Sequence, residues 1–469
     1  MRRNRRRHLD KEGSPVFRAM PGQRRTPANP MPRRLPRASI ASYLLEVEWS
    51  LAYIGFLVYV FVVITFQLGI ASIAIGAGLI GVIIRDGGWK FPPFLVFLTL
   101  YLLWAALGYF GSAYPDVVSQ AALVLAKLWV VAFVAVNALR TRKQIRLFMV
   151  LSVLWFAMYP ARGAIFNYVF GGYALAGRAI WNYSYANPND LAALTLVQLA
   201  IAGALVVSEP RGWVKRGAVA AIVVLPILVL MTQSRGAFLA LVVTAPLALA
   251  GERRPVRALW IAVAVATVAV LVAPRGVWQR VRGLVWVTDT TALERVDPEG
   301  SAKSRFEIWR VASRIIQDHP VTGVGFGTYP LAHEAYSGEL GTVGLATRME
   351  DTHSTYLNVL AETGYPGLVL FLLLLGMVLY EAETARRKAR QTDQRGALQV
   401  LYLELGLVAF LIAGVFGSFG KLTYLYVHLA LVCTAATSVR SAWAAYQRPL
   451  KGQGKRRRER PRQGRIASA

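Results

Sequence analysis

Residues 92–111 read PPFLVFLTLYLLWAALGYFG and contain no charged side chain. Twenty mostly apolar residues are the length that an α-helix needs to cross the hydrocarbon core of a bilayer. This stretch therefore predicts a membrane-spanning helix. The composition of the whole chain agrees, because 55% of its 469 residues are hydrophobic and only 17% are charged, whereas a soluble domain carries about 25% charged residues.

Further apolar segments repeat this pattern along the chain. They lie at 50–67, 69–84, 117–139, 145–161, 191–208, 214–231, 236–250, 257–273, 366–380, 399–416 and 422–440. The segment 236–250 is short, and it needs residues 231–234 or a protein-lined environment to complete a span. We therefore predict an all-α integral membrane protein with about 12 transmembrane helices and a long periplasmic loop that contains amphipathic helices.

Basic residues fall in alternate loops between these segments. The basic loops contain Arg85 and Lys90, residues 140–146, 211–216, 253–257 and 386–390, and both chain ends belong to the same set. Cytoplasmic loops of membrane proteins carry an excess of Lys and Arg. We therefore predict a multi-pass protein of the inner (cytoplasmic) membrane with both termini in the cytoplasm. An even number of spans agrees, because it returns the chain to the side on which it began.

Both ends of the chain are strongly basic. Residues 1–40 hold 12 basic and 2 acidic residues, and residues 448–469 hold 9 basic residues and a single acidic one. Runs of this kind bind nucleic acid in some proteins. Beside membrane spans, we predict instead that they retain the ends in the cytoplasm and attract anionic membrane lipids. We expect no nucleic-acid partner.

The pattern divides the chain into five parts. Residues 1–42 form a disordered basic cytoplasmic tail, 43–273 carry transmembrane helices 1–9, and 274–353 form the long periplasmic loop. Residues 354–440 hold a re-entrant or interfacial helix and transmembrane helices 10–12, and 441–469 form a second basic cytoplasmic tail.

Residues 304–318, within the long loop, have the pattern of an amphipathic helix. Ser304 and Glu307 have the spacing of a capping box at its start. The helix either lies flat on the membrane or covers the outer ends of the spans. Its apolar stripe follows the i, i+3, i+4, i+7, i+8 spacing and consists of Ile308, Val311, Ala312, Ile315 and Ile316.

Three outward segments carry groups that suit chemistry at a membrane surface. Arg235, in Ser234-Arg235-Gly236, lies on the side where the positive-inside bias disfavours arginine. It either snorkels to lipid headgroups or binds an anion, because a guanidinium stays charged and holds phosphate oxygens in pairs. Arg305 lies off the apolar stripe of 304–318. His353 precedes the next apolar helix and can accept a proton near neutral pH, although a lone histidine is more often structural.

Other motifs limit the chemistry. The cluster Gly323-Val324-Gly325-Phe326-Gly327 lacks the Gly-Lys-Ser/Thr ending of a phosphate-binding loop, so we interpret it as a structural turn. No histidine has a partner at metal-ligand spacing, and no Gly-x-Ser-x-Gly motif occurs. We therefore predict no metal site and no cofactor.

Taken together, these segments resemble the bacterial O-antigen ligase/polymerase superfamily, from about residue 187 to 368. The residues that carry the resemblance are Asn187-Pro188-Asn189, Ser234-Arg235-Gly236, Ser304-Arg305 with Trp309, residues 318–327, and His353-Ser354 with Tyr356, Glu362 and Gly364. The family has His-Asn where this chain has His353-Ser354. In this respect the chain is similar to the exosortase-associated O-glycosylation ligase branch.

The resemblance implies a metal-independent lipid-linked oligosaccharide transferase with a periplasmic active site. Such enzymes move a glycan from an undecaprenyl-diphosphate carrier to a hydroxyl of lipid A–core, another lipid or a protein. It implies that His353 activates the acceptor hydroxyl, and that Arg235 and Arg305 bind the diphosphate. Substrate contacts are expected on this basis for Asn187, Asn189, Ser234, Trp309, Gly325 and Glu362.

Three other functions remain open. A polymerase that joins carried repeat units shares these motifs. A polysaccharide or lipid transporter suits 12 spans, but it needs ionisable groups near the bilayer midplane, for which Lys127 and Glu404 are the main candidates. A scaffold that binds glycan through its outer loop is the third. Transport should survive the loss of His353, whereas ligation should not.

Overall fold

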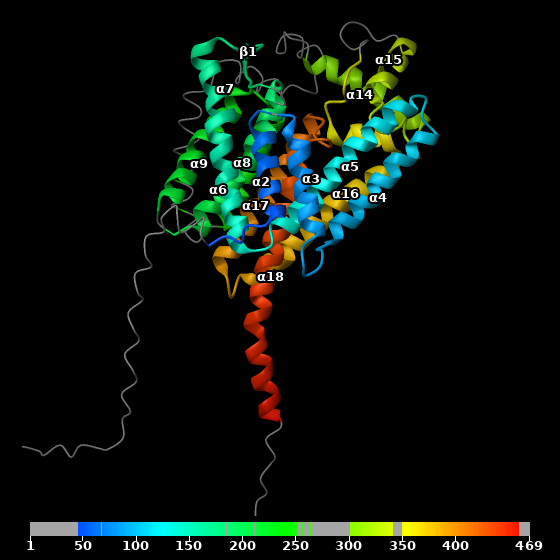
Figure 1. Cartoon of the computed structure of the whole chain (residues 1–469). Helices are drawn as coiled ribbons and strands as arrows, with labels where there is room; N and C mark the ends of the chain where they lie inside the picture. Colours follow the sequence, from blue (N-terminus) through cyan, green and yellow to red (C-terminus); the bar gives the residue numbers. More distant parts are fainter. Residues whose placement is uncertain are drawn as a thin grey trace, which may run out of the picture. The chain divides into compact units, whose positions relative to one another are not determined.

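The computed structural model describes residues 46–66, 68–182, 185–210, 212–251, 256, 260, 263, 301–340 and 349–458, and it gives no side-chain detail for 301–303 and 447–458. The first of two compact units, Met1–Ala38, lies outside the described residues, together with the rest of the predicted N-terminal tail 1–42. The second unit, Ser39–Ala469, contains all the elements below (Figure 1).

The described part of the chain is mostly helical, and eight of its helices are long and apolar enough to cross a membrane. They are α4 (Pro93–Leu107) with η1 (Gly108–Phe110), α5 (Pro115–Ala138), α6 (Arg142–Phe156) with η2 (Ala157–Ala161), α7 (Arg162–Phe166) and η3 (Asn167–Gly171), α8 (Pro188–Ser208), α9 (Trp213–Met231), α16 (Thr355–Ala389), α17 (Gln394–Ala413) with η6 (Gly414–Phe416), and α18 (Thr423–Arg458). The chain is therefore a multi-pass membrane protein.

Three further apolar helices are shorter. They are α2 (Leu51–Ile64), α3 (Ile70–Ile83) and α10 (Arg235–Gly251). Together with the eight long helices, they account for all the predicted apolar segments except 257–273. That segment lies outside the described residues apart from Trp260 and Val263. The count of about 12 spans stays a prediction.

The helices pack through small residues and apolar side chains. α17 lies against α8 and α10, α2 lies against α3, and α16 lies against α4 and α18. Between α2 and α3 the backbones approach closely, since a Cβ added to Gly55 would lie 2.6 Å from the carbonyl oxygen of Ala74. Small residues permit this kind of contact where apolar side chains alone do not drive association.

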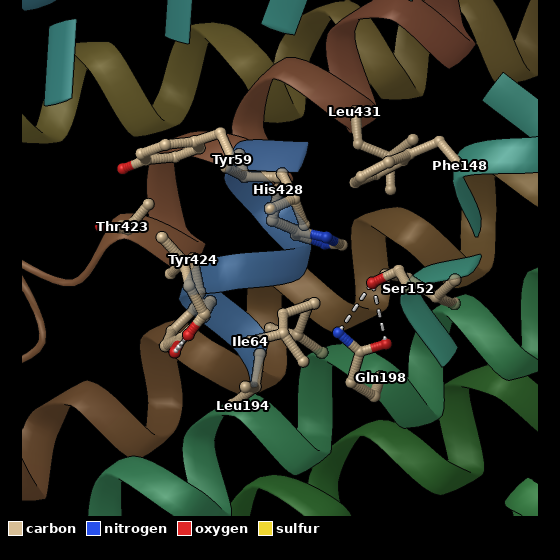
Figure 2. Close-up of a pocket in the computed structure, with 15 residues that line it drawn as sticks. Tyr59, Ile64, Phe148, Ser152, Leu194, Gln198, Thr423, Tyr424, His428 and Leu431 are labelled. Carbon is tan, nitrogen blue, oxygen red and sulfur yellow. Dashed lines mark hydrogen bonds between the residues drawn. The ribbon is translucent and has the colours of Figure 1, made fainter. Parts of the chain in front are cut away.

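A cavity lies among α2, α6, α8 and α18 (Figure 2). Its polar groups include Ser152 and Gln198, whose side chains hydrogen-bond to each other at 3.0 Å and 3.2 Å. They also include His428, whose Nε2 lies 2.8 Å from the carbonyl oxygen of Leu403. None of the residues expected to act on a substrate lines this cavity.

A break in α16 occurs at Gly364. Gly364 has φ 66° and ψ −174°, so the carbonyls before it lose their helical partners. The Val324 amide donates to the carbonyl of Ala361 at 3.0 Å, and the Gly325 amide donates to that of Glu362 at 3.1 Å. The segment 320–325 therefore supplies hydrogen-bond donors to the carbonyl groups that the break leaves unpaired. The glycine cluster is a structural turn, as predicted.

Two helices outside the long spans, α14 (Ser301–Asp318) and α15 (Tyr329–Glu339), lie at one end of the bundle (Figure 1). The predicted apolar stripe of α14 is confirmed, because all five of its side chains are buried in a small core shared with α15 and α16. The capping box is wrong, because α14 begins at Ser301 and Ser304 lies inside the helix.

Other local predictions also differ. The helical run from α6 continues to Gly171 and is followed by a hairpin of β1 (Ala174–Leu175) and β2 (Arg178–Ala179). The protein is therefore not strictly all-α. α18 extends beyond residue 440, into the segment predicted as a tail.

Gly364→Ala should destabilise the fold. A Cβ at this position would lie 2.0 Å from the carbonyl oxygen of Val321, and the combination of φ 66° with ψ −174° costs a residue with a side chain about 1–3 kcal/mol. We expect a melting temperature in detergent clearly below that of the wild type. Gly376→Ala is the matched control, because it lies in the same helix with nothing within 4 Å. Equal melting temperatures for Gly364→Ala and the wild type would contradict this account.

Candidate active site

The three residues expected to carry the chemistry each lie at or near the start of a helix. Arg235 is the first residue of α10, Arg305 lies in the first turns of α14, and His353 directly precedes the N-cap of α16. Because α14 packs on α16, Arg305 and His353 belong to one surface. The burial of His353 lowers the pKa of its imidazole, and the charge of Arg305 lowers that pKa further, which indicates that the two side chains are close.

His353 is held in an unusual backbone conformation. Its φ is 49°, which costs a non-glycine residue about 1–3 kcal/mol and is found mostly where the surrounding structure fixes it. Here the Thr352 hydroxyl fixes it, donating to the carbonyl of Ser354 at 2.8 Å and accepting from the Ser354 amide at 3.2 Å. The Asp351 carboxylate accepts from the Thr352 amide at 2.8 Å.

The surroundings of His353 favour the neutral form of its imidazole. Burial and Arg305 lower its pKa, and Asp351 opposes them with a smaller effect. Glu350 also lies nearby, with 4.0 Å between its Oε2 and Nε2 of His353, and a third of the His353 side chain remains exposed. A neutral, accessible imidazole can accept a proton from a hydroxyl group.

α14 also supports the segment before His353. The indole Nε1 of Trp309 donates to the carbonyl of Thr352 at 2.9 Å, so Trp309 positions the backbone beside His353. Tyr329 on α15 donates from its hydroxyl to the carbonyl of Ile308 at 3.2 Å. These two contacts join α14, α15 and the start of α16. A direct substrate contact of Trp309 stays a prediction.

A partly buried chain of polar side chains adjoins this surface. Glu362 is 1% exposed, and its two carboxylate oxygens lie 3.1 Å and 3.0 Å from Nζ of Lys421. The amide of Asn358 donates to Glu362 at 3.4 Å and to Asp351 at 3.2 Å. The chain Lys421–Glu362–Asn358–Asp351 therefore ends two residues from His353. Glu362 lies under the site, and its predicted substrate contact is untested.

Arg235 follows a second strained residue. Gln233 has φ 51°, and its side-chain amide donates to the carbonyl of Gly177 at 2.7 Å. Arg178 on β2 donates to the carbonyl of Thr232 at 2.9 Å and to Oδ1 of Asn189 at 2.8 Å. The hairpin therefore ties the segment before Arg235 to the start of α8.

The two halves of the site meet at residues 413–419. A Cβ on Gly236 would lie 3.0 Å from the carbonyl oxygen of Ala413, so the start of α10 packs closely on the end of α17. The Thr355 hydroxyl donates to the carbonyl of Gly417 at 2.7 Å and accepts from the Phe419 amide at 2.8 Å. The same short segment therefore contacts both the Arg235 and the His353 sides.

The remaining predicted contacts have local structural roles. Asn187 is the N-cap of α8, and its side chain accepts from the Asn189 amide at 2.9 Å. Ser234 is buried, and its carbonyl accepts from the Phe238 amide at 3.0 Å in the first turn of α10. The Gly325 amide donates a hydrogen bond to the backbone carbonyl of Glu362, as described above. Substrate binding by these residues stays a prediction.

Sequence reasoning missed Lys421, Arg178 and Asn358. Lys421 had a detectable signal, because it is a lone cation in a turn between two apolar segments. Arg178 had none, because its partners Thr232 and Asn189 lie in other segments of the chain. Asn358 lies four residues before Glu362 in α16, at the spacing at which side chains of a helix meet, so that contact could have been found from the sequence. Within the described ranges, no group of three or more His, Cys, Asp or Glu residues is arranged to hold a metal ion.

One comparison with known proteins bears on this site. Residues 220–372 match a family model described as O-Antigen ligase. The matched region contains Arg235, Arg305, His353, Glu362 and the break at Gly364. No curated protein matches the chain.

Removal of the Lys421 ammonium should destabilise the protein, because the Glu362 carboxylate then loses the cation that it pairs with. Lys421→Met leaves the buried Glu362 carboxylate without its cation, and we expect a loss of about 2–3 kcal/mol in folding free energy. The melting temperature in detergent measures it. The double variant Glu362→Gln/Lys421→Met removes both charges and should recover most of the loss. A double variant as unstable as the single one would argue against this ion pair.

Proposed function

We propose that this chain, a multi-pass membrane protein whose residues 220–372 match the O-antigen ligase family model, moves a glycan from an undecaprenyl-diphosphate carrier to an acceptor hydroxyl. The observation that carries the proposal is the partly exposed imidazole of His353, whose pKa is lowered by burial and by the cationic Arg305. A base for the acceptor and a cation for the diphosphate are the two groups that this reaction needs in one place.

In the proposed step, the neutral imidazole of His353 takes the proton of the acceptor hydroxyl. The acceptor oxygen attacks the anomeric carbon and forms the new glycosidic bond. The bond between that carbon and the phosphate oxygen breaks, and undecaprenyl diphosphate leaves with its electron pair. This is a direct transfer with inversion at the anomeric carbon, and a trapped glycosyl–enzyme intermediate would contradict it.

The two arginines act on the leaving group. Negative charge develops on the diphosphate as the bond breaks, and fixed guanidinium groups stabilise it without reorganisation. Arg305 has a second effect, because its charge keeps the His353 pKa low. Arg235 lies at the start of α10, which the hairpin and residues 413–419 fix in place.

The proposed orientation follows from the charge of the two ends. α14 lies at one end of the bundle, and the loop between α3 and α4, with Arg85 and Lys90, lies at the other (Figure 1). The end with the basic loops should face the cytoplasm. This orientation agrees with the prediction that both termini are cytoplasmic, and it would expose His353 to the periplasm, where a carried glycan is presented.

Transport is less well supported by the ionisable groups inside the spans. The Lys127 side chain is exposed on the outside of the bundle. Glu404 pairs with Arg386, with 3.4 Å between its Oε2 and Nε of Arg386. Transporters direct such groups into an interior pathway.

Polymerisation uses the same residues as ligation, and the His353-Ser354 pair favours the ligase branch. The acceptor, whether lipid A–core, another lipid or a protein, is identified by the product.

Purified protein should transfer a labelled glycan from undecaprenyl diphosphate to an acceptor in a membrane extract from the native host. We expect His353→Ala, Arg235→Ala and Arg305→Ala each to lower the rate about 100-fold or more, because each removes a group that acts in the transition state. The assay follows release from the carrier, and mass spectrometry identifies the labelled product.

Matched controls lie near the site. His319 hydrogen-bonds to Tyr336 and Arg314 pairs with Asp318, and neither is part of the proposed chemistry. His319→Ala and Arg314→Ala should retain most of the activity. A His353→Ala variant that transfers at the wild-type rate would show that His353 is not the base. Glycan movement without covalent transfer would favour the transporter.

The pH dependence of transfer should report the His353 pKa. The base must be neutral, so the rate should fall as the pH drops through this pKa, which lies below the ordinary value of 6.5 because of burial and Arg305. Arg305→Gln removes one of these causes, so the acid limb of its normalised profile should move to higher pH. Arg314→Gln should leave the limb in place. An acid limb that does not move in Arg305→Gln would mean that another group titrates.

A further inference from the structure

Three cations meet at the end of the bundle remote from α14, where the loop 84–92 lies beside the end of α5 (Figure 1). They are Arg85, Lys90 and Arg140. Burial lowers the pKa of Lys90, and the charges of Arg140 and Arg85 lower it further. Burial and Arg85 lower the pKa of Arg140 in the same way. The fold therefore holds three mutually repelling charges together.

Asn137 fixes this cluster in place. It is 1% exposed, and its Oδ1 accepts from the Lys90 amide at 2.8 Å and from Nη2 of Arg140 at 3.0 Å. Its Nδ2 donates to the carbonyl of Lys90 at 3.0 Å. Nη2 of Arg140 also donates to the carbonyl of Gly88. The buried side-chain amide of Asn137 therefore fixes the position of the loop 84–92 and of the Arg140 guanidinium.

Two donors of the cluster have no acceptor among the described residues. Nη1 of Arg85 and Nε of Arg140 are buried without a hydrogen-bond partner there. The nearest carboxylate to Arg85 is that of Glu48, which is 4.0 Å from Nη2 and 70% exposed. Buried charged donors without an acceptor are costly. An oxyanion placed between these side chains would satisfy them and relieve their repulsion.

The depth of the cluster indicates where the anion comes from. Trp89 is 61% exposed and directly precedes Lys90, and exposed tryptophan is typical of the headgroup level of a membrane. We propose that Arg85, Lys90 and Arg140 form a binding site for a phosphate group, supplied by an anionic phospholipid of the adjoining leaflet. This site is separate from the proposed transferase site at the other end of the bundle.

The test measures the affinity of the purified full chain, in uncharged detergent, for a soluble short-chain phosphatidylglycerol, from the rise in melting temperature with lipid concentration. Arg85→Gln/Lys90→Gln keeps the hydrogen bonds between Asn137 and Arg140. We expect it to bind about tenfold more weakly. Without lipid it should melt no lower than the wild type, because repelling charges are removed. If it does not fold, Lys90→Met is used, with about threefold weaker binding expected.

Lys143→Gln/Arg390→Gln is the control, because it removes the same charge from two exposed residues at that end. Its affinity should equal that of the wild type, and phosphatidylcholine of the same chain length should bind more weakly than phosphatidylglycerol. If inorganic phosphate at matched ionic strength stabilises the wild type as strongly, and Arg85→Gln/Lys90→Gln abolishes this, the phosphate site stands and its ligand is the free anion. Equal lipid affinity in the wild type and Arg85→Gln/Lys90→Gln overturns the proposal.

Discussion

The break in α16 at Gly364 is the constraint on which the candidate site depends. A long apolar helix cannot leave carbonyls unpaired without a large cost. The amides of Val324 and Gly325 pair with those before the break, and the Tyr365 amide donates to the carbonyl of Pro320 at 2.9 Å. These bonds attach the turn after α14 to the bundle. The first part of α16 is thereby held under α14 and α15, with His353 at its start.

Strain and burial concentrate around the same residues. Among the described residues, only Ala176, Gln233 and His353 combine a side chain with a positive φ. Gln233 lies two residues before Arg235, and His353 is the proposed base. Each is fixed by neighbours rather than by its own preference, which is the usual condition for strained residues at functional sites. Preorganisation of this kind keeps reacting groups in place before a substrate arrives.

The two ends of the bundle use cations differently. At the end of the bundle that carries the candidate site, Lys421 pairs with the buried Glu362 carboxylate. Arg178 donates hydrogen bonds to the backbone carbonyl of Thr232 and to the Asn189 side chain. Those charges are engaged in building the structure. At the opposite end, Arg85 and Arg140 keep buried nitrogens without an acceptor in the described part of the chain. Cations that are fixed and unsatisfied indicate ligand binding more strongly than a high local charge alone.

The sequence by itself determined the apolar helices and the amphipathic stripe of α14, and it singled out Arg235, Arg305 and His353 as candidates, because length, periodicity and residue type are local properties. Only the tertiary structure decided which of these residues share a surface. The pairing of Lys421 with Glu362 spans 59 residues, and sequence spacing does not encode such a contact. The predicted capping box at Ser304 was wrong because the helix begins earlier, at Ser301. The local residue pattern does not fix where a helix starts.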